Sequence, residues 1–315
     1  MKSILQRKAQ KFSYRRLALR KKSRFTFVVL LRGFLCSVSF NLTHLLAEFA
    51  MKSILLILFL YFIIEGLCFA DASSHFEEKK IPNRILFIGN SYLFYNDGVS
   101  NHVKRMTDEM FPEKAHLFSY KLATISGARL EHHNLDWLLD TKKVGVKDQF
   151  DLVILQGHSG ASLSEESRKK FYYQTGLKIK KIRASGGKAA LYMTPAYVEP
   201  HELHDANMLN MIQETYIKSG NNYQVPVIPV GLAFERAYQI RPKLTLHKKF
   251  DGSHPDLLGT YLAACVVFAS VFNITPEGLH YDYYGAISTT DRIFLQKIAK
   301  ETVDAFVGQE YGELR

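Results

Sequence analysis

The chain has 315 residues, of which 47% are hydrophobic and 23% are charged, and its formal net charge is +11. The hydrophobic content is sufficient for a sizeable core in one large domain or two small ones. Residues 1–50 contain 11 of the 41 Lys and Arg residues but one acid, Glu48, which leaves 30 basic and 29 acidic residues in the rest of the chain. This balance argues against nucleic acid as a partner, because phosphate binding needs a basic face on the folded domain.

The N-terminal part contains a candidate export signal. The string "MKSIL" at Met1 recurs at Met51, where it opens "MKSILLILFLYFIIEGLCFADASS". One lysine, a long apolar run and small residues near Ala70 predict a signal peptide over residues 51–70. The alternative is an uncleaved membrane anchor, for which the run is near the lower length limit. Residues 1–50 are interpreted as a basic leader or as a misassigned upstream extension.

This interpretation leaves residues 71–315 as the mature domain. If the protein begins at Met51, we expect it to be secreted or otherwise extracytoplasmic; if it does not, we expect it to be membrane-anchored through the N-terminal segment alone. Of the three cysteines, only Cys265 lies in the mature part, so no disulfide can form within it. Its setting, "YLAACVVFASVF", is typical of a small core residue.

From residue 84 onward, short apolar runs alternate with longer segments of helical periodicity. The predicted strands are 84–88, 116–120, 151–155, 188–193 and 225–230, and the predicted helices are 98–111, 128–140, 164–185, 202–219, 232–240, 257–272 and 290–307. Continuously apolar strands separated by helices indicate a parallel sheet covered on both faces. The sequence therefore predicts one α/β domain, a three-layer α/β/α sandwich around a doubly wound, flavodoxin-like, five-stranded sheet.

Several polar residues follow the predicted strands. These are Ser91 in "RILFIGNSYLFYN", Gly127 in "ATISGARLEHH", the segment 156–159 in "LQGHSGAS" and the segment 194–197 in "MTPAY". In an open α/β sheet the ligand crevice lies beyond the carboxyl ends of the strands. We therefore expect these residues to share one edge of the sheet.

A triad can be assembled from Ser91 and one motif near the C-terminus. A serine hydroxyl becomes a nucleophile when a base takes its proton and a carboxylate fixes the tautomer of that base. The stretch "FDGSHPDLLGTYLAA" supplies Asp251 and His254 on a loop that leads into an apolar helix. Taken alone, this motif is equally consistent with an Asp-Gly turn followed by a helix cap.

Acyl transfer also needs hydrogen-bond donors directed at the developing oxyanion. The backbone N–H groups of Ser91 and Gly127 are candidates, because both residues lie between a strand and a helix. The third predicted strand ends with two side-chain candidates, Gln156 and His158. Each signal is weak by itself, but the four lie in order along one edge.

The motifs "GNSY", the isolated Gly127, "QGHS" and "DGSH" resemble, in that order, the four sequence blocks of the SGNH/GDSL hydrolase superfamily. The resemblance covers about residues 84–275 and implies a flavodoxin-like α/β/α fold with esterase, lipase, thioesterase or carbohydrate deacetylase activity. It further implies that Ser91 is the nucleophile, His254 the general base, Asp251 the orienting acid and Gly127 an oxyanion donor. A serine mechanism of this kind requires no metal and no organic cofactor.

Two positions depart from the superfamily pattern. Asn90 stands where the first block usually has Asp, and "QGHS" replaces the usual Gly-x-Asn-Asp of the third block. The second change places His158 where an oxyanion-binding Asn is expected. Both the His158 imidazole and the Gln156 amide can donate a hydrogen bond, so the side chain that donates to the oxyanion can be either of them.

Other polar and aromatic clusters are weighed against structural roles. The group His201, Glu202, His204 and Asp205 in "EPHELHD" lacks zincin spacing and an evident third ligand, so we interpret it as a solvated helix start and not a metal site. The adjacent His132 and His133 are interpreted as surface residues. Two aromatic sets can be either substrate walls or core packing: Tyr92, Phe94 and Tyr95, and Tyr281, Tyr283 and Tyr284.

The function predicted from these residues is that of a secreted serine esterase or acyl hydrolase, with a small-molecule or glycan ester as its substrate and carbohydrate O-deacetylation as the favoured reaction. The alternative is a non-catalytic carbohydrate- or glycolipid-binding module with the same fold, which the altered third block favours. A phosphate-binding protein is a third reading, but "GNS" lacks the longer glycine-rich cradle and its lysine.

Overall fold

The computed structural model of the chain describes residues 81–306. The predicted leader over residues 1–50 and signal peptide over residues 51–70 lie outside the described residues. Within residues 81–306, no helix combines the length and the apolar character needed to cross a membrane.

The sheet contains five parallel strands: β1 (Arg84–Gly89), β2 (Ser119–Thr124), β3 (Leu152–Gln156), β4 (Lys188–Tyr192) and β5 (Val227–Ile228). Their spatial order is β2-β1-β3-β4-β5. This order reverses direction at β1, whose neighbours are β2 on one side and β3 on the other. The predicted flavodoxin-like, doubly wound sheet is therefore confirmed.

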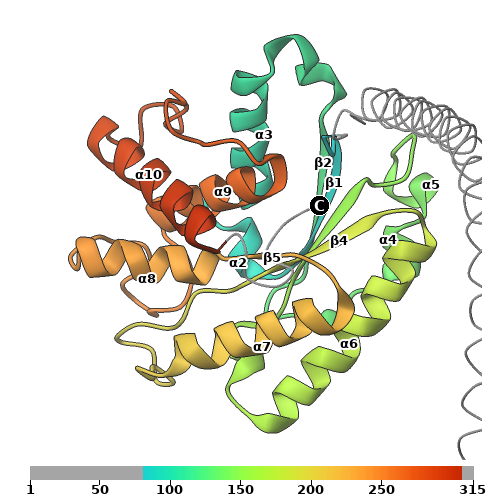
Figure 1. Cartoon of the computed structure of the whole chain (residues 1–315), viewed down its shortest axis with the longest axis horizontal. Helices are drawn as coiled ribbons and strands as arrows, with labels where there is room; N and C mark the ends of the chain where they lie inside the picture. The colour runs from blue at the N-terminus through green and yellow to red at the C-terminus, as the bar shows by residue number, and fades with distance from the viewer. Residues whose placement is uncertain (1–80, 307–315) are drawn as a thin grey trace, which may run out of the picture. The chain divides into compact units, whose positions relative to one another are not determined.

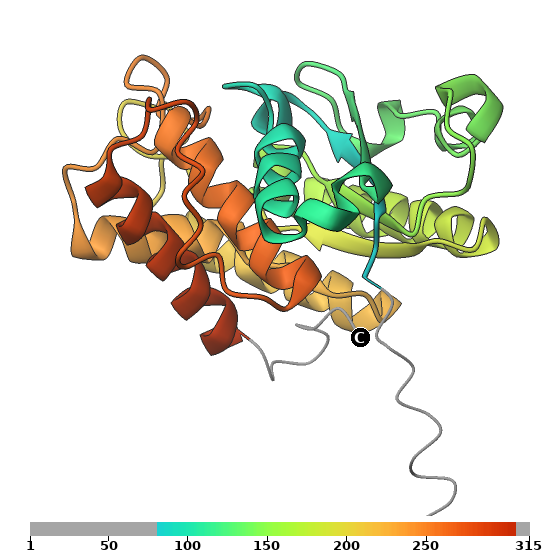
Figure 2. The same cartoon turned by 90° about the horizontal axis from the view of Figure 1, so that it is seen from above.

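Helices cover both faces of the sheet (Figure 1). They are α2 (Ser91–Phe94), α3 (Val99–Met110), α4 (Leu135–Leu138), α5 (Thr141–Val144), α6 (Glu165–Ala184), α7 (Met208–Tyr223), α8 (Val230–Ile240), α9 (Leu257–Phe272) and α10 (Thr289–Phe306), with short 3₁₀ helices at Pro112–Leu117, Leu130–His132 and Ser159–Ser162. Figure 2 shows α9 and α10 on the opposite side of the sheet from α6.

Alternation along the strands divides the interior into two cores. Ile85 and Phe87 of β1 pack with residues of α3, α8, α9 and α10, whereas Leu86 and Ile88 pack with residues of α4, α6 and α7. Successive side chains of a strand point to opposite faces, so a continuous apolar run is what a sheet covered on both sides requires. The three-layer α/β/α architecture follows directly from this pattern.

Helix α9 is the most buried of the helices, and its N-terminus carries the loop that contains Asp251 and His254. Nearly all of its residues are buried between the sheet, α3 and α10. Cys265 lies in its middle, fully buried, as expected of a small core residue, and burial raises the pKa of its thiol. Asp256 caps the helix by accepting a hydrogen bond from the Leu257 N–H.

Several predicted boundaries are wrong, and proline or local capping explains most of them. The strand predicted at 116–120 begins at Ser119, because a 3₁₀ helix with Pro112 at its start occupies the preceding residues. The strand predicted at 225–230 has two residues, flanked by Pro226 and Pro229, which have no N–H for a ladder. The helix predicted over 128–140 is split into short helices, one of them capped by Asn134.

Candidate active site

Ser91 lies at the carboxyl end of β1 and is the first residue of α2. Asn90 caps this helix, because its side-chain Oδ1 accepts a hydrogen bond from the Tyr92 N–H at 3.1 Å. The preceding Gly89 has no room for a side chain, since a Cβ atom there would overlap the Gln156 side chain. The turn therefore holds Ser91 at a fixed point where the strand becomes a helix.

The structure brings Ser91, His254 and Asp251 into one hydrogen-bonded series. His254 Nε2 lies 2.9 Å from Ser91 Oγ, and His254 Nδ1 lies 2.6 Å from Asp251 Oδ2. A carboxylate can only accept, so the proton of the neutral imidazole sits on Nδ1 and leaves Nε2 free to accept from the serine hydroxyl. This is the geometry in which a histidine can act as a general base toward a serine.

Asp251 is held in its role by its own loop. Its Oδ1 accepts hydrogen bonds from the backbone N–H groups of Ser253 at 2.9 Å and His254 at 3.0 Å. Burial by itself raises the pKa of this carboxyl, but the hydrogen bonds from Ser253 and His254 outweigh it and lower the pKa. Asp251 therefore stays ionised beside His254 at neutral pH.

The two aromatic sets have different positions. Tyr95 lies beside His254, with ring centroids 4.8 Å apart, and stacks on Phe94, whose exposed fraction is 39%. These two rings thus form an aromatic edge next to the triad. In contrast, Tyr281 and Tyr283 pack around the buried His102 of α3, so they serve the core and not the triad.

Comparison with solved structures supports the fold. A DUF4886 family protein from Bacteroides uniformis aligns with a TM-score of 0.57 and 18% identity, over 73% of this chain and 97% of that one. A candidate SGNH hydrolase from Slackia heliotrinireducens aligns with a TM-score of 0.49 and 20% identity, over 59% of this chain and 97% of that one. The chain shares the α/β/α fold of the DUF4886 family structure.

An acetyl xylan esterase also aligns, with a TM-score of 0.48 and 15% identity, over 60% of this chain and 99% of that one. The sequence matches no protein-family model and no relative among the curated proteins. At these identities the likeness concerns the fold alone, so the chemistry has to be argued from the residues of this chain.

Gly127 lies in the exposed loop that follows β2, the neighbour of β1. Its φ of 63° is in the left-handed region, and no atom lies within 4 Å of where its Cβ would be. The loop is tied to the serine turn, because the Asn90 Nδ2 donates to the Ala128 carbonyl at 3.1 Å. No backbone hydrogen bond within residues 81–306 uses the N–H of Gly127 or of Ser91.

The same contacts explain why an asparagine occupies position 90. Its side chain accepts from Tyr92 and donates to Ala128, and a carboxylate cannot do both. We expect Asn90→Asp to lower the free energy of unfolding by about 2 kcal/mol at pH 8, because a buried carboxylate oxygen would face the Ala128 carbonyl oxygen. Urea denaturation followed by circular dichroism measures this change.

A matched control is Asn134→Asp, which changes the exposed cap of α4. Within residues 81–306, the Asn134 side chain accepts from the Trp137 N–H and donates no hydrogen bond, so the carboxylate preserves its contact. We expect this variant to be as stable as the parent. Equal stability of Asn90→Asp and the parent would contradict the assigned role of the Asn90 amide.

The third sequence block is placed differently from what the motif suggested. Both ends of the Gln156 amide are engaged within the fold: Oε1 accepts from the Asn90 N–H at 2.8 Å, and Nε2 donates to the Gly157 carbonyl. Gln156 therefore braces the serine turn, and one of the two N–H groups of its amide is engaged within the fold. Its predicted role as an oxyanion donor stays a prediction.

His158 caps the short helix that follows β3. Its Nδ1 accepts from the Gly160 N–H at 3.0 Å, so the neutral ring carries its proton on Nε2. Burial, followed by the nearby Arg129, lowers the pKa of His158. The ring lines a small cavity with Arg129, Lys170 and Phe171, none of which belongs to the triad. The neutral ring thus keeps its Nε2–H as a donor, and the predicted role of His158 at the oxyanion stays a prediction.

His133 corrects the surface interpretation of the histidine pair. Its exposed fraction is 4%, and burial, together with the neighbouring Lys178, lowers the pKa of its imidazole. The side chain lies at the Gly89 backbone carbonyl, directly before the serine turn. The residue pair alone could not reveal this, because it is the fold of the preceding loop that turns His133 inward while His132 faces outward and bonds the Arg129 N–H.

The histidine-rich segment after β4 forms local contacts. The His201 ring stacks on Tyr197 at 3.6 Å between centroids, and His204 Nδ1 lies 3.2 Å from Glu199 Oε1. Among residues 81–306, no group of three or more His, Cys, Asp or Glu side chains is arranged to hold a metal ion.

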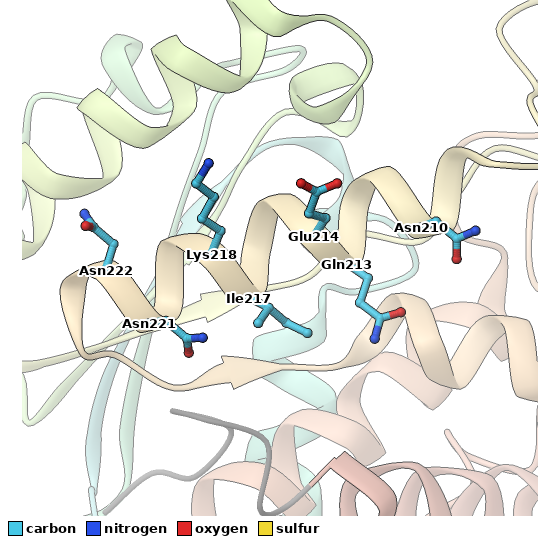
Figure 3. Close-up of a pocket in the computed structure, with 7 residues that line it drawn as sticks. All are labelled: Asn210, Gln213, Glu214, Ile217, Lys218, Asn221 and Asn222. Carbon is cyan, nitrogen blue, oxygen red and sulfur yellow. The ribbon is translucent and has the colours of Figure 1, made fainter.

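A surface depression of about 700 Å³ lies along α7, away from Ser91 (Figure 3). Its side chains do not converge, because Lys218 and Glu214 project to one side of the helix and Ile217 and Asn221 to the other (Figure 3). A helix surface of this kind offers no common centre for a ligand. The candidate site therefore remains the edge around Ser91.

A second buried histidine predicts a pH-dependent stability. His247 lies behind the Asp251 loop, bonded through Nδ1 to the Tyr238 hydroxyl at 2.8 Å, and burial lowers its pKa from 6.5 to about 4. In the unfolded chain the His247 imidazole therefore takes up a proton as pH falls below 6.5. In the folded chain it takes up this proton only when pH falls to about 4. This side chain stabilises the fold at neutral pH, and its contribution is lost as pH falls through that range.

Between pH 7.5 and pH 5, we expect this loss to be about 2 kcal/mol from His247 alone. The free energy of unfolding of the parent and of His247→Asn, measured at both pH values, separates the contribution of His247. The contributions of His102, His133 and His158 are common to both proteins. The parent should lose about 2 kcal/mol more than the variant. Equal losses would show that His247 does not titrate in this way.

Proposed function

We propose that this protein is an exported serine esterase that cleaves an ester bond through Ser91, His254 and Asp251. The observation that carries the proposal is the unbroken series of hydrogen bonds from Ser91 Oγ through His254 to Asp251. The residues come from the end of β1 and from the loop before α9, which are 160 positions or more apart in the chain. Their convergence at the carboxyl edge of the sheet supports a catalytic role over a turn and a cap.

In the first half of the reaction, the Ser91 hydroxyl attacks the ester carbonyl while His254 Nε2 takes its proton. The tetrahedral oxyanion is stabilised by the N–H groups of Ser91 and Gly127. Asp251 stabilises the imidazolium and keeps Nε2 directed at the serine. His254 then gives the proton to the leaving alcohol, and an acyl-enzyme on Ser91 remains.

In the second half, water replaces the alcohol. His254 takes a proton from the water, the resulting hydroxide attacks the acyl carbonyl, and the carboxylic acid leaves as Ser91 regains its proton. All of these steps use groups of the chain and its substrate, so the proposed reaction needs neither a metal nor an organic cofactor.

For the substrate class we propose a carbohydrate O-acyl ester, with acetyl as the favoured acyl group. Two features support this class: an export signal is predicted, which would bring the protein to glycans, and the stacked Phe94 and Tyr95 rings offer an aromatic edge beside His254 for a sugar ring. Lys248 extends this edge, since its Nζ lies 5.2 Å from the Tyr95 ring centroid.

The test is acetate release from acetylated xylan and from p-nitrophenyl acetate by the full chain. We expect both esters to be hydrolysed, with Ser91→Ala inactive on both. Hydrolysis of p-nitrophenyl acetate alone would support the esterase but contradict the glycan substrate. No hydrolysis of either ester by a folded protein would contradict the esterase proposal itself.

One observation favours the alternative of a non-catalytic glycan- or glycolipid-binding module. One N–H of the Gln156 amide and the Nδ1 atom of His158 are engaged within the fold, and loss of one oxyanion donor can cost about 10²- to 10³-fold in rate. A pure binder would have no chemical need for the series from Ser91 to Asp251. Calorimetric binding of glycans with no acetate release would favour this alternative.

A further inference from the structure

Tyr92, the residue after Ser91, contacts the loop that carries the acid and the base. Its hydroxyl lies 2.7 Å from Ser253 Oγ, although 161 positions separate the two residues in the chain. Tyr92 is 3% exposed, and its ring centroid lies 5.7 Å from that of His254. A buried tyrosine normally finds a partner for its hydroxyl, but this partner sits between Asp251 and His254.

These contacts close a ring of five residues around the site. Tyr92 is joined covalently to Ser91 and through its hydroxyl to Ser253, whose N–H donates to Asp251 Oδ1. Asp251 Oδ2 contacts His254, and His254 contacts Ser91. Each member is therefore fixed by two neighbours of the same ring, so the base cannot move from the nucleophile without breaking a hydrogen bond in the ring.

The far side of the loop is fixed separately. The Val198 N–H donates to the Gly252 carbonyl at 2.8 Å, and the adjacent Tyr197 donates its hydroxyl to Ser159 Oγ at 2.7 Å. These contacts restrain the backbone at Gly252, whereas Tyr92 restrains Ser253. Burial raises the pKa of Tyr92, so its hydroxyl stays neutral across the working pH range.

We propose that Tyr92 is a positioning residue, which acts through Ser253 to hold Asp251 and His254 in register with Ser91. The inference rests on the proposed function for its catalytic consequence, but the ring itself is a property of the fold. In this arrangement one short segment, Ser91-Tyr92, supplies both the nucleophile and the brace for its base.

Three variants test the proposal: Tyr92→Phe, Ser253→Ala and the double variant. For p-nitrophenyl acetate we expect each single change to lower kcat and kcat/KM together, about tenfold, with KM unchanged, because a misaligned base affects the transition state and not substrate binding. The double variant should lose no more than either single variant, since both remove the same contact.

The matched control is Tyr120→Phe, which removes another tyrosine hydroxyl bonded to a hydroxyl, that of Thr107, away from the triad. We expect its kcat to equal that of the parent. Unchanged kcat in Tyr92→Phe would overturn the proposal, as would losses that multiply to about a hundredfold in the double variant.

A second measurement does not depend on activity. The low-field proton resonance between His254 Nδ1 and Asp251 should be sharp in the parent and in Tyr120→Phe, and broadened in Tyr92→Phe and Ser253→Ala. An inactive parent with this pattern would overturn the esterase but support the ring. A resonance equally sharp in all four proteins would overturn the role of Tyr92.

Discussion

Replacement of Ser91 by alanine is expected to lower kcat for p-nitrophenyl acetate at least about 10³-fold after correction for the buffer rate, because no other group can form the acyl-enzyme. His254→Ala should lose about as much, since the serine hydroxyl is a weak nucleophile without its base. The double variant should be no worse than either, because nucleophile and base act as one unit. Steady-state kinetics of the three variants measure these losses.

Circular dichroism and thermal unfolding provide the control for these variants, because both side chains lie at the edge of the sheet and not inside either core. We expect the variants to remain folded. Residual activity near that of the parent in a folded Ser91→Ala protein would show that hydrolysis takes place elsewhere. Full activity in His254→Ala would remove the general base from the mechanism.

The second large effect is expected at Gly252, between the acid and the base. Gly252 has a φ of 59°, and a Cβ there would overlap the Val198 carbonyl oxygen. We expect Gly252→Ala to lower the free energy of unfolding by about 3 kcal/mol, from left-handed strain and the loss of the Val198 to Gly252 hydrogen bond. Displacement of Asp251 should also lower kcat about a hundredfold. Urea denaturation and kinetics measure the two effects.

The control for this variant is Gly145→Ala at the C-terminus of α5. Gly145 has a similar φ of 65°, but no atom lies within 4 Å of its Cβ position. It therefore carries the backbone strain without the overlap, and we expect a loss of about 1 kcal/mol with unchanged kcat. Equal effects of the two substitutions on stability and kcat would contradict the close contact between Gly252 and Val198.

Much of the fold was predictable because the residues of each strand show, without their neighbours in space, that the strand is covered on both faces. Each face of β1 needs apolar residues, so "RILFI" reads as a doubly covered strand before any neighbour is known. Helix α9 was likewise evident from its unbroken apolar sequence. The ends of elements were less predictable where prolines act: Pro226 and Pro229 confine β5 to two residues, although "VPVIPV" is apolar throughout.

Ser91 was predictable for a related reason, because it follows a strand and strand ends in a parallel sheet share an edge. The "DGSH" loop follows a helix, so its pairing with Ser91 was predicted from the chemistry that a serine, a histidine and a carboxylate can perform together. The order of the motifs then favoured this pairing over a chance turn. In the structure, His254 Nε2 lies 2.9 Å from Ser91 Oγ, and His254 Nδ1 lies 2.6 Å from Asp251 Oδ2.

The supporting contacts could not be predicted, because they join distant positions through side-chain geometry. The sequence names Gln156 as a candidate oxyanion donor, but it gives no sign that the Gln156 Oε1 accepts from the Asn90 N–H. His133 and Tyr92 gave no periodic or spacing signal for their burial against the serine turn. Such contacts depend on which loop passes behind the site, and a single sequence records them only as unremarkable polar residues.

The central claim is that Ser91 is a nucleophile activated by His254. The most direct measurement is labelling of the full chain with a fluorophosphonate probe, followed by peptide mass spectrometry. We predict one adduct, on the peptide that contains Ser91, which is absent from Ser91→Ala and strongly reduced in His254→Ala. A folded parent that stays unlabelled, or an adduct on another serine, would contradict the account.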